Sequence, residues 1–399
     1  MKSFKKIAAF MFAVLIAMSF GACSRQSATA NKEWSFKAYG KEYPMGVYLA
    51  AMSDAYEEAY ATLYYQNSSF DTGDTILQME TSFDESGKIY TVKEWMSKIS
   101  HEYLQRFAAL DYLVDKHGVT LSDYAQSSAY EQARNNWYVG DLEGELDGIS
   151  TAYPLKDKYE PIGISFDSYY QVSYLMNVKF QAVFDKLYSK GGEREVPDKD
   201  LTEYFEKNYT SYSYFVADLY EQTADEVTGE IVTAPFDEKT TQEVKAKIES
   251  YEEMIKNGAT TQEISDDYKA YTNSVGDSSM FMSNVEHYDD VEVSLSVEIA
   301  EALRNMDNNT ATTVYLGQEN TPIAVFVYKS DVSKLTKDYI GDEINYKTIL
   351  ENYKGDEFES YVDELADKTV LEYNPIIEEK FTAEYIEEKY RKYLSEFEQ

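Results

Sequence analysis

The fold is decided by Asn257-Gly258-Ala259-Thr260-Thr261-Gln262-Glu263-Ile264 and, shortly after, Val275-Gly276-Asp277-Ser278-Ser279-Met280-Phe281. An amphipathic helix precedes Asn257-Gly258 and ends there, because glycine readily adopts the left-handed conformation that closes a helix. A short helix follows over 261–271, and a further helix is predicted over 294–305. Strand-like runs lie on either side, at 212–220 and 322–328. These elements predict a small α+β unit spanning 196–335.

This order resembles the parvulin (rotamase) domain of the PrsA/SurA family of extracytoplasmic foldases. Gly258 with Ile264 resembles the family's glycine-plus-apolar helix signature, and Gly276-Asp277 with Phe281 is similar to its Gly-Gly-Asp-Leu-Gly-x-Phe loop. Segments 298–303 and 323–328 resemble its closing helix and strand. The resemblance implies a small antiparallel sheet with helices. It also implies a client-binding role for the residues that follow the loop, Met280, Phe281 and Met282, although Phe281 is equally expected in a core.

The sequence departs from this family where the catalytic residues would stand. Active parvulins carry one histidine on the first strand and one on the last, beside a cysteine or aspartate. The chain's three histidines are His101, His117 and His287, and none lies in 212–220 or 322–328. The acid or thiol position falls near Asn273, whose amide does not ionise. Rotation about an X–Pro bond crosses a barrier of about 18–20 kcal/mol. We therefore assign no catalytic residue and expect a domain that binds chains but isomerises proline poorly or not at all.

Composition bounds the class of protein. The 399 residues suffice for two or three domains, and 43% hydrophobic residues argue against a largely disordered chain. The net charge of -35 makes nucleic acid an improbable partner. The 38 tyrosines are unusual. For any single tyrosine, packing in a core is the preferred interpretation, although a chaperone surface also uses rigid aromatic faces.

The N-terminus is predicted to be a secretory leader. Residues 1–22 combine a basic start, an apolar run and small residues before Cys23, the only cysteine. Phe20-Gly21-Ala22-Cys23 resembles a bacterial lipobox, which implies lipidation of Cys23, with 23–32 as a tether. The alternative is plain secretion with an incidental free thiol. Lipidation is favoured because an isolated thiol is a liability in an oxidising compartment.

The remaining sequence predicts a mainly helical domain in two pieces. Residues 33–195 form its N-terminal part, including a capping box at Thr91–Glu94, and 336–399 form a C-terminal return that completes it. Within the return, 338–368 reads as two helices interrupted at Gly355, and 369–373 as a strand. The helix over 382–397 either docks on this body or supplies a homodimer contact. His101 and His117 are expected to face solvent.

Signatures of other chemistry are absent from the sequence. There is no Gly-x-Ser-x-Gly elbow, phosphate-binding glycine loop or His-Glu-x-x-His motif. The acidic stretch 140–148 lacks the glycine and the final glutamate of a calcium-binding EF-hand and is predicted to be a solvated loop. We therefore predict no metal and no cofactor.

The fold class predicted is α+β: a mainly helical SurA/PrsA-like chaperone domain with an inserted parvulin-like module. The function expected is a membrane-anchored, extracytoplasmic chaperone or foldase whose partners are unfolded secreted polypeptides. One alternative is an active peptidyl-prolyl isomerase with an atypical pocket, in which Phe281→Ala would abolish turnover. A second is a solute-binding lipoprotein, which the helix-rich N-terminal half disfavours.

Overall fold

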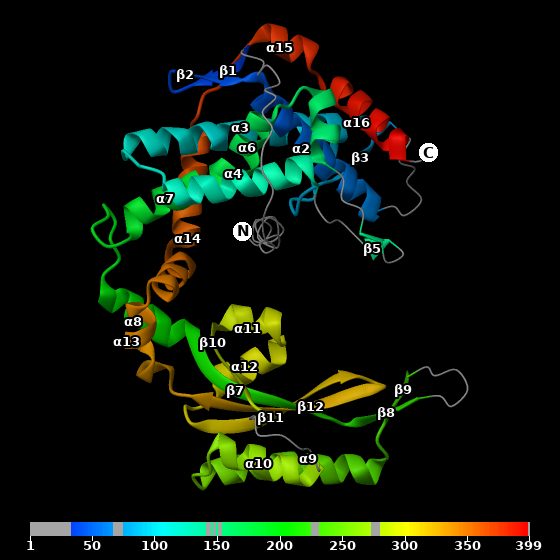
Figure 1. The fold of residues 1–399 in the computed structure, drawn as a ribbon, viewed down its shortest axis with the longest axis vertical. Coiled ribbons are helices and arrows are strands. Elements are labelled where there is room, and N and C mark those ends of the chain that lie inside the picture. Colours follow the sequence, from blue (N-terminus) through cyan, green and yellow to red (C-terminus); the bar gives the residue numbers. More distant parts are fainter. Residues whose placement is uncertain are drawn as a thin grey trace. The chain divides into compact units, whose positions relative to one another are not determined.

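The computed structural model describes residues 33–66, 75–140, 145–146, 149–150, 154–224, 231–272 and 280–397. Unit 1 comprises the described parts of Met1–Glu195 and Gly355–Gln399, and unit 2 comprises those of Val196–Lys354. Both are mainly helical with small antiparallel sheets, so the predicted α+β class is confirmed (Figure 1). Unit 2 continues past residue 335, where the predicted module ended.

Unit 1 is built around three helices, α2 (Met45–Gln66), α3 (Val92–Lys116) and α7 (Met176–Tyr188). The predicted capping box begins α3: Thr91 Oγ1 accepts the Glu94 N–H, and the Glu94 carboxylate accepts the Thr91 N–H. The further elements that precede unit 2 are short or lie at the surface. They are β1 (Trp34–Ala38), β2 (Lys41–Pro44), β3 (Glu80–Ser82), β4 (Ile89–Thr91), α4 (Asp123–Tyr138), β5 (Glu145–Leu146), β6 (Ile149–Ser150), α5 (Leu155–Tyr159), η1 (Glu160–Ile162), α6 (Phe166–Tyr170) and the π-helical turn η2 (Gln171–Leu175).

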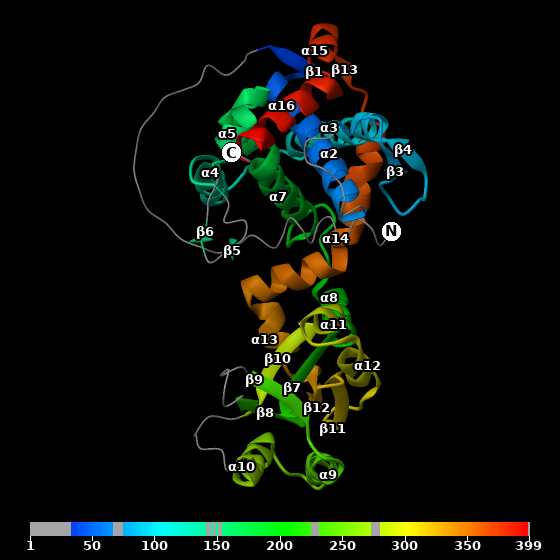
Figure 2. The same ribbon diagram turned by 90° about the vertical axis from the view of Figure 1, so that its right-hand side faces the viewer.

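The C-terminal return packs into unit 1. Its elements are the end of α14 (Glu343–Asp367), β13 (Glu372–Tyr373), α15 (Pro375–Lys380) and α16 (Ala383–Phe397). β13 pairs with β1 through Phe36 and Tyr373, which places segments more than 300 residues apart in one sheet (Figure 2). The buried Glu387 on α16 accepts the N–H of Ile76 at 2.6 Å and that of Leu77 at 3.3 Å. The last helix therefore docks on unit 1, which is one of the two roles predicted for it.

Unit 2 contains a four-stranded antiparallel sheet in the order β10-β7-β12-β11. Its strands are β7 (Tyr209–Asp218), β10 (Met282–His287), β11 (Thr310–Gln318) and β12 (Thr321–Ser330). Helices α9 (Glu238–Lys256) and α10 (Thr261–Thr272) cover one face, and α11 (Tyr288–Ser294) and α12 (Val297–Asn305) pack on the other (Figure 1). The remaining elements are α8 (Asp198–Asn208), the hairpin β8 (Tyr220–Ala224) and β9 (Ile231–Pro235), η3 (Val332–Lys334), α13 (Thr336–Gly341) and the start of α14.

Several element predictions were wrong. β10, β11 and the short helix α11 were not anticipated, whereas the helix expected over 294–305 is observed as α12, which begins three residues later, at Val297. The break expected at Gly355 is absent, because α14 runs through it, and the chain bends instead between Gly341 and Glu343. The strand expected over 369–373 shrinks to the two residues of β13. The buried residues Phe358 and Val362 continue the apolar stripe beyond Gly355, which explains why the helix persists.

Candidate functional site

The candidate site of unit 2 lies on its central strand pair, β7 and β12. The two strands run antiparallel in continuous register, with Tyr214 opposite Val327 and Val216 opposite Val325. The prediction that 212–220 and 322–328 lie side by side is therefore confirmed. Neither strand contains a histidine.

Two polar side chains on the face of this pair toward α12, Tyr212 and Lys329, already have hydrogen-bond partners. Tyr212 donates its hydroxyl to Glu286 Oε2 at 2.7 Å, and burial, followed by Glu286, raises the pKa of Tyr212, so it is neutral at physiological pH. Lys329 Nζ donates to the carbonyl oxygens of Leu303 at 2.7 Å and Met306 at 3.0 Å. Their hydrogen-bonding capacity therefore stabilises the fold and is not directed at a bound peptide.

Helices α11 and α12 cover only part of this face. Side chains beneath them, such as Val325 and Val327, are buried, whereas Val216 is 39% exposed and Met282 is 50% exposed. We call the uncovered part the open apolar face; it consists of Val216, Met282, Val314, Leu316 and Ile323. The last three are only partly buried and pack against the buried residues of this face. A rigid sheet thus presents aliphatic side chains to solvent.

The three client-binding candidates, Met280, Phe281 and Met282, do not act as one group. Met280 and Phe281 pack against the core under α9 and α10, with the Phe281 ring centroid 5.1 Å from that of Phe215 and 5.9 Å from that of Phe326. Met282, on β10, lies opposite Tyr214 of β7. Its side chain is therefore on the same face of the sheet as that of Tyr214, the face toward α12. Only Met282 belongs to the open apolar face. Phe281→Ala would remove core packing, so it is a poor probe of a binding pocket.

The motif residues that the structure describes have structural roles. Gly258, at φ +93°, follows the last turn of α9, and its N–H donates to the Ile255 carbonyl oxygen at 2.9 Å. Ile264, on α10, is fully buried in the core that α9 and α10 form with the sheet. Gly276, Asp277, Asn273 and Cys23 lie outside the described residues, as does most of the acidic stretch 140–148.

His287, the histidine of unit 2, uses both ring nitrogens to hold the fold. Nδ1 accepts the backbone N–H of Asp289 at 3.2 Å and so caps α11. The proton therefore lies on Nε2, which is 3.2 Å from the Tyr204 hydroxyl; that hydroxyl in turn donates to the Asn352 carbonyl oxygen at 2.9 Å. His287 has no nitrogen left for a proline peptide.

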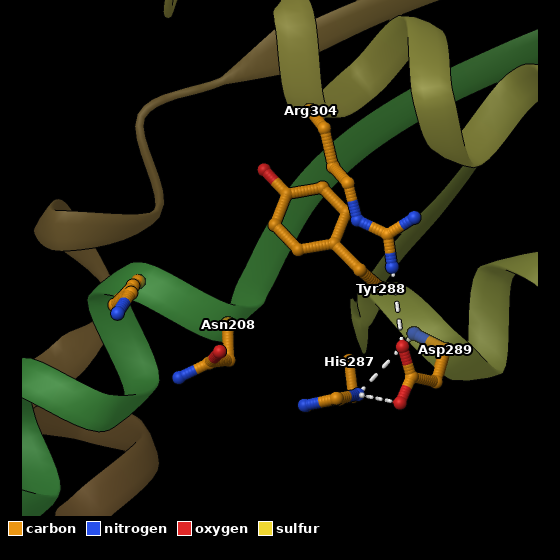
Figure 3. A pocket seen from close by; sticks show the side chains of 6 residues that line it. Asn208, His287, Tyr288, Asp289 and Arg304 are labelled. Atoms are coloured by element: carbon orange, nitrogen blue, oxygen red, sulfur yellow. Dashed lines mark hydrogen bonds and ion pairs between the residues drawn. The ribbon is translucent and has the colours of Figure 1, made fainter.

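An open polar pocket of about 290 Å³ lies beside His287 (Figure 3). Arg304 lies at this pocket between two carboxylates, 3.1 Å from Asp289 and 2.5 Å from Glu292. The pocket is lined by Lys207, Asn208, His287, Tyr288, Asp289 and Arg304. It contains no aliphatic side chain and is poorly suited to a proline ring or an apolar client.

The expectation that the two histidines of unit 1 face solvent was wrong. The side chain of His117 is only 7% exposed, and its Nδ1 lies 3.0 Å from Glu193 Oε1. His101 is partly buried, with Nδ1 2.7 Å from the Tyr373 hydroxyl, and so ties α3 to β13. Both residues join segments of unit 1.

Within the described ranges, no group of three or more His, Cys, Asp or Glu side chains is placed to hold a metal ion. None of the helices that the structure describes is both long and apolar enough to span a bilayer.

No family model matches the chain, and no curated protein matches it. Among solved structures, it is similar to the foldase protein PrsA from Streptococcus pneumoniae, at 13% identity and a TM-score of 0.34, over 76% of this chain and 99% of that one. This identity and TM-score are too low to assign a function.

Proposed function

We propose that this chain is an extracytoplasmic, membrane-anchored chaperone that holds unfolded secreted polypeptides, with a parvulin-like module that has little or no isomerase activity. The observation that carries the proposal is the open apolar face beside the β7–β12 strand pair. The two strands of the pair lie side by side, and neither contains a histidine.

Binding without catalysis follows from the chemistry of this face. Val216 and Met282 offer exposed apolar area on a rigid sheet, which favours contact with apolar side chains of any sequence. Catalysis of isomerisation would require groups that favour the twisted amide over the planar one. The nearby donors, Tyr212 and Lys329, are already bound to Glu286 and to the end of α12.

Anchoring rests on the sequence of the leader. Phe20-Gly21-Ala22-Cys23 supports diacylation of Cys23. In cells fed a labelled fatty acid, the wild-type protein should carry the label and sediment with membranes, whereas Cys23→Ala should be unlabelled and released. An unlabelled wild-type protein would favour plain secretion.

The holding activity is tested by suppression of aggregation of a chemically unfolded client, followed by light scattering. Met282→Glu places a charge on the open apolar face and should lower suppression several-fold. The matched control is Ser283→Glu, which adds the same charge to the next residue of β10 on the opposite face. Equal loss in both variants, or loss in neither, would argue against this face as the binding site.

The absence of isomerase activity is tested separately with a proline-containing peptide. The wild-type protein should leave the cis-to-trans rate close to that of the uncatalysed reaction, which takes tens to hundreds of seconds at 25 °C. Rapid, protein-dependent isomerisation would instead support the enzyme alternative.

A further inference from the structure

The outer edge of β11 is a sheet edge to which no described strand is added. β11 is the last strand in the order β10-β7-β12-β11, and no described strand pairs with its outer side. Nine consecutive residues, Thr310 to Gln318, pair with β12 without a shift in register. The edge therefore presents a long row of backbone N–H and C=O groups at regular spacing.

The sequence of β11 lacks the residues that usually protect such an edge. Edge strands are commonly short or are interrupted by lysine, proline or a bulge. β11 has the sequence Thr-Ala-Thr-Thr-Val-Tyr-Leu-Gly-Gln, with no charged residue and no proline. Its first seven residues are mostly β-branched or aromatic, which favours strand pairing. The other edge strand, β10, is shorter and carries Glu286 and His287.

The side chains beside this edge indicate what an added strand would contact. On the face toward α12 it would lie next to Val314 and Leu316, which are part of the open apolar face. On the face toward α9 it would lie next to Tyr315, which is 40% exposed and donates its hydroxyl to Glu249 Oε1 at 2.5 Å. Both sides accept apolar side chains, and Glu249 adds negative charge on the α9 side.

Charge decides between the possible occupants of the edge. Each copy of this chain has a net charge of -35, so two copies repel each other. That repulsion opposes pairing of two β11 edges. The same charge attracts an extended chain rich in lysine or arginine. An unfolded polypeptide also has free backbone groups along its length, as strand addition requires.

We propose that the outer edge of β11 binds an extended segment of an unfolded, positively charged polypeptide by adding it to the sheet as a fifth strand. This inference rests on the proposed chaperone function and identifies the class of client segment and the mode of contact. Backbone hydrogen bonds supply an affinity that does not depend on client sequence, while the adjoining apolar side chains favour alternating patterns.

The ligand arm of the test uses fluorescently labelled 12-residue peptides and anisotropy. A peptide of alternating valine and lysine should bind. The same peptide N-methylated at four consecutive central amides loses donors on both of its edges and should bind at least ten-fold more weakly. A valine–glutamate peptide should also bind at least ten-fold more weakly. Equal binding of the methylated and unmethylated lysine peptides would overturn strand addition.

The protein arm uses Thr312→Pro and Thr313→Pro. Consecutive residues of a strand direct their N–H groups to opposite sides, so only one of the two prolines removes an outward N–H and spares the pairing with β12. That variant keeps the wild-type Tm and should lose peptide binding at least ten-fold. Thr312→Val and Thr313→Val keep the N–H and should bind as the wild type does. If both proline variants unfold, the peptide pair decides.

The outcomes separate this inference from the proposed function. If the protein suppresses client aggregation but binds the methylated and unmethylated peptides equally, strand addition is contradicted and the chaperone function is supported. If the protein neither suppresses aggregation nor binds the peptide, both strand addition and the proposed chaperone function are contradicted. A wild-type dimer in sedimentation that the tolerated proline variant abolishes would show that a second copy occupies the edge, which would overturn the choice of occupant.

Discussion

Lys329 carries a buried charge in the sheet of unit 2, and no carboxylate of the described residues forms an ion pair with it. The residue is 9% exposed on β12, and its ammonium group lies at the C-terminal end of α12, where two carbonyl oxygens accept its hydrogen bonds. The helix dipole adds to this attraction, because the C-terminal end of a helix carries partial negative charge. Lys329 therefore attaches α12 to the sheet.

Replacing Lys329 with methionine should destabilise unit 2 by about 3 kcal/mol, because two buried carbonyl groups lose their charged donor. Hydrogen exchange should show faster opening of the amides in α12, and urea unfolding should give the free-energy change. Lys334→Met is the matched control: Lys334 is 71% exposed and lies 4.0 Å from Asp331, so its loss should cost less than about 0.5 kcal/mol. Equal effects of the two substitutions would contradict this role.

Met280, Phe281 and Met282 show how far the candidate site could be predicted from the sequence. The motif located the segment, but three adjacent apolar residues carry no information about which face of a sheet each will occupy. That depends on where β10 begins, and β10 forms only through pairing with β7. Val216 lay in a predicted strand, but its exposure depends on how much of the sheet the short helix α12 covers. No local signal encodes that coverage.

Among the helices and strands, those with a strong local signal were predicted from the sequence, and those without one were missed. α3, α9, β7 and β12 were predicted because each has a strong apolar period or a recognisable cap. β10 and β11 were missed because edge strands have weaker alternation and owe their conformation to the central strands. Met282-Ser283-Asn284-Val285-Glu286-His287 would be read as a loop on composition alone.

Gly355 gives an element-level prediction, since it was expected to end a helix and instead lies inside α14. A Cβ built at Gly355 meets nothing within 4 Å, and Gly355 is not among the glycines with positive φ. Gly355→Ala should therefore stabilise the protein by about 0.5–1 kcal/mol, because alanine loses less conformational entropy on folding. The result should be a rise in Tm of about 2 °C.

Gly118 supplies the control for that substitution. A Cβ there also meets nothing within 4 Å, but its φ is +55°. Gly118→Ala should lower Tm, because the left-handed conformation costs a residue with a Cβ about 1–2 kcal/mol. If both variants shift Tm in the same direction, backbone conformation is not what separates the two positions.

For the whole molecule, the 38 tyrosines set how stability responds to alkaline pH. Many pack within the cores of both units, where burial penalises the charged phenolate. Burial raises the pKa of Tyr48 in unit 1 to about 12, and that of Tyr209 and Tyr268 in unit 2 to about 12. Burial also raises the pKa values of Tyr43, Tyr56, Tyr251 and Tyr390. The core-packing interpretation of the sequence therefore applies to these residues.

The sign of the effect follows from comparing the folded and unfolded chains. An unfolded tyrosine has a pKa of about 10, so the folded chain holds its phenolic protons more tightly. The stabilising contribution is complete below about pH 10 and is lost as the pH rises toward 12. A shift of two pKa units corresponds to at most about 2–3 kcal/mol per group across this window, and solvent screening lowers the contribution of groups that keep some contact with water. A few such groups equal the total stability of a typical domain, about 5–15 kcal/mol.

We therefore expect both units to unfold between about pH 10 and pH 12, with buried tyrosines ionising only as the chain opens. Tyrosinate absorbance near 295 nm should rise in two stages, first for exposed residues such as Tyr65 and Tyr124 and then together with the loss of helical circular dichroism. Tyr65→Phe removes an exposed phenol and should reduce only the first stage. Tyr251→Phe keeps the buried ring but removes a phenol whose ionisation favours the unfolded chain. The second stage of the absorbance rise, in its contribution from unit 2, should therefore move to higher pH. A single titration of all tyrosines near pH 10, with circular dichroism unchanged, would contradict this account of their burial.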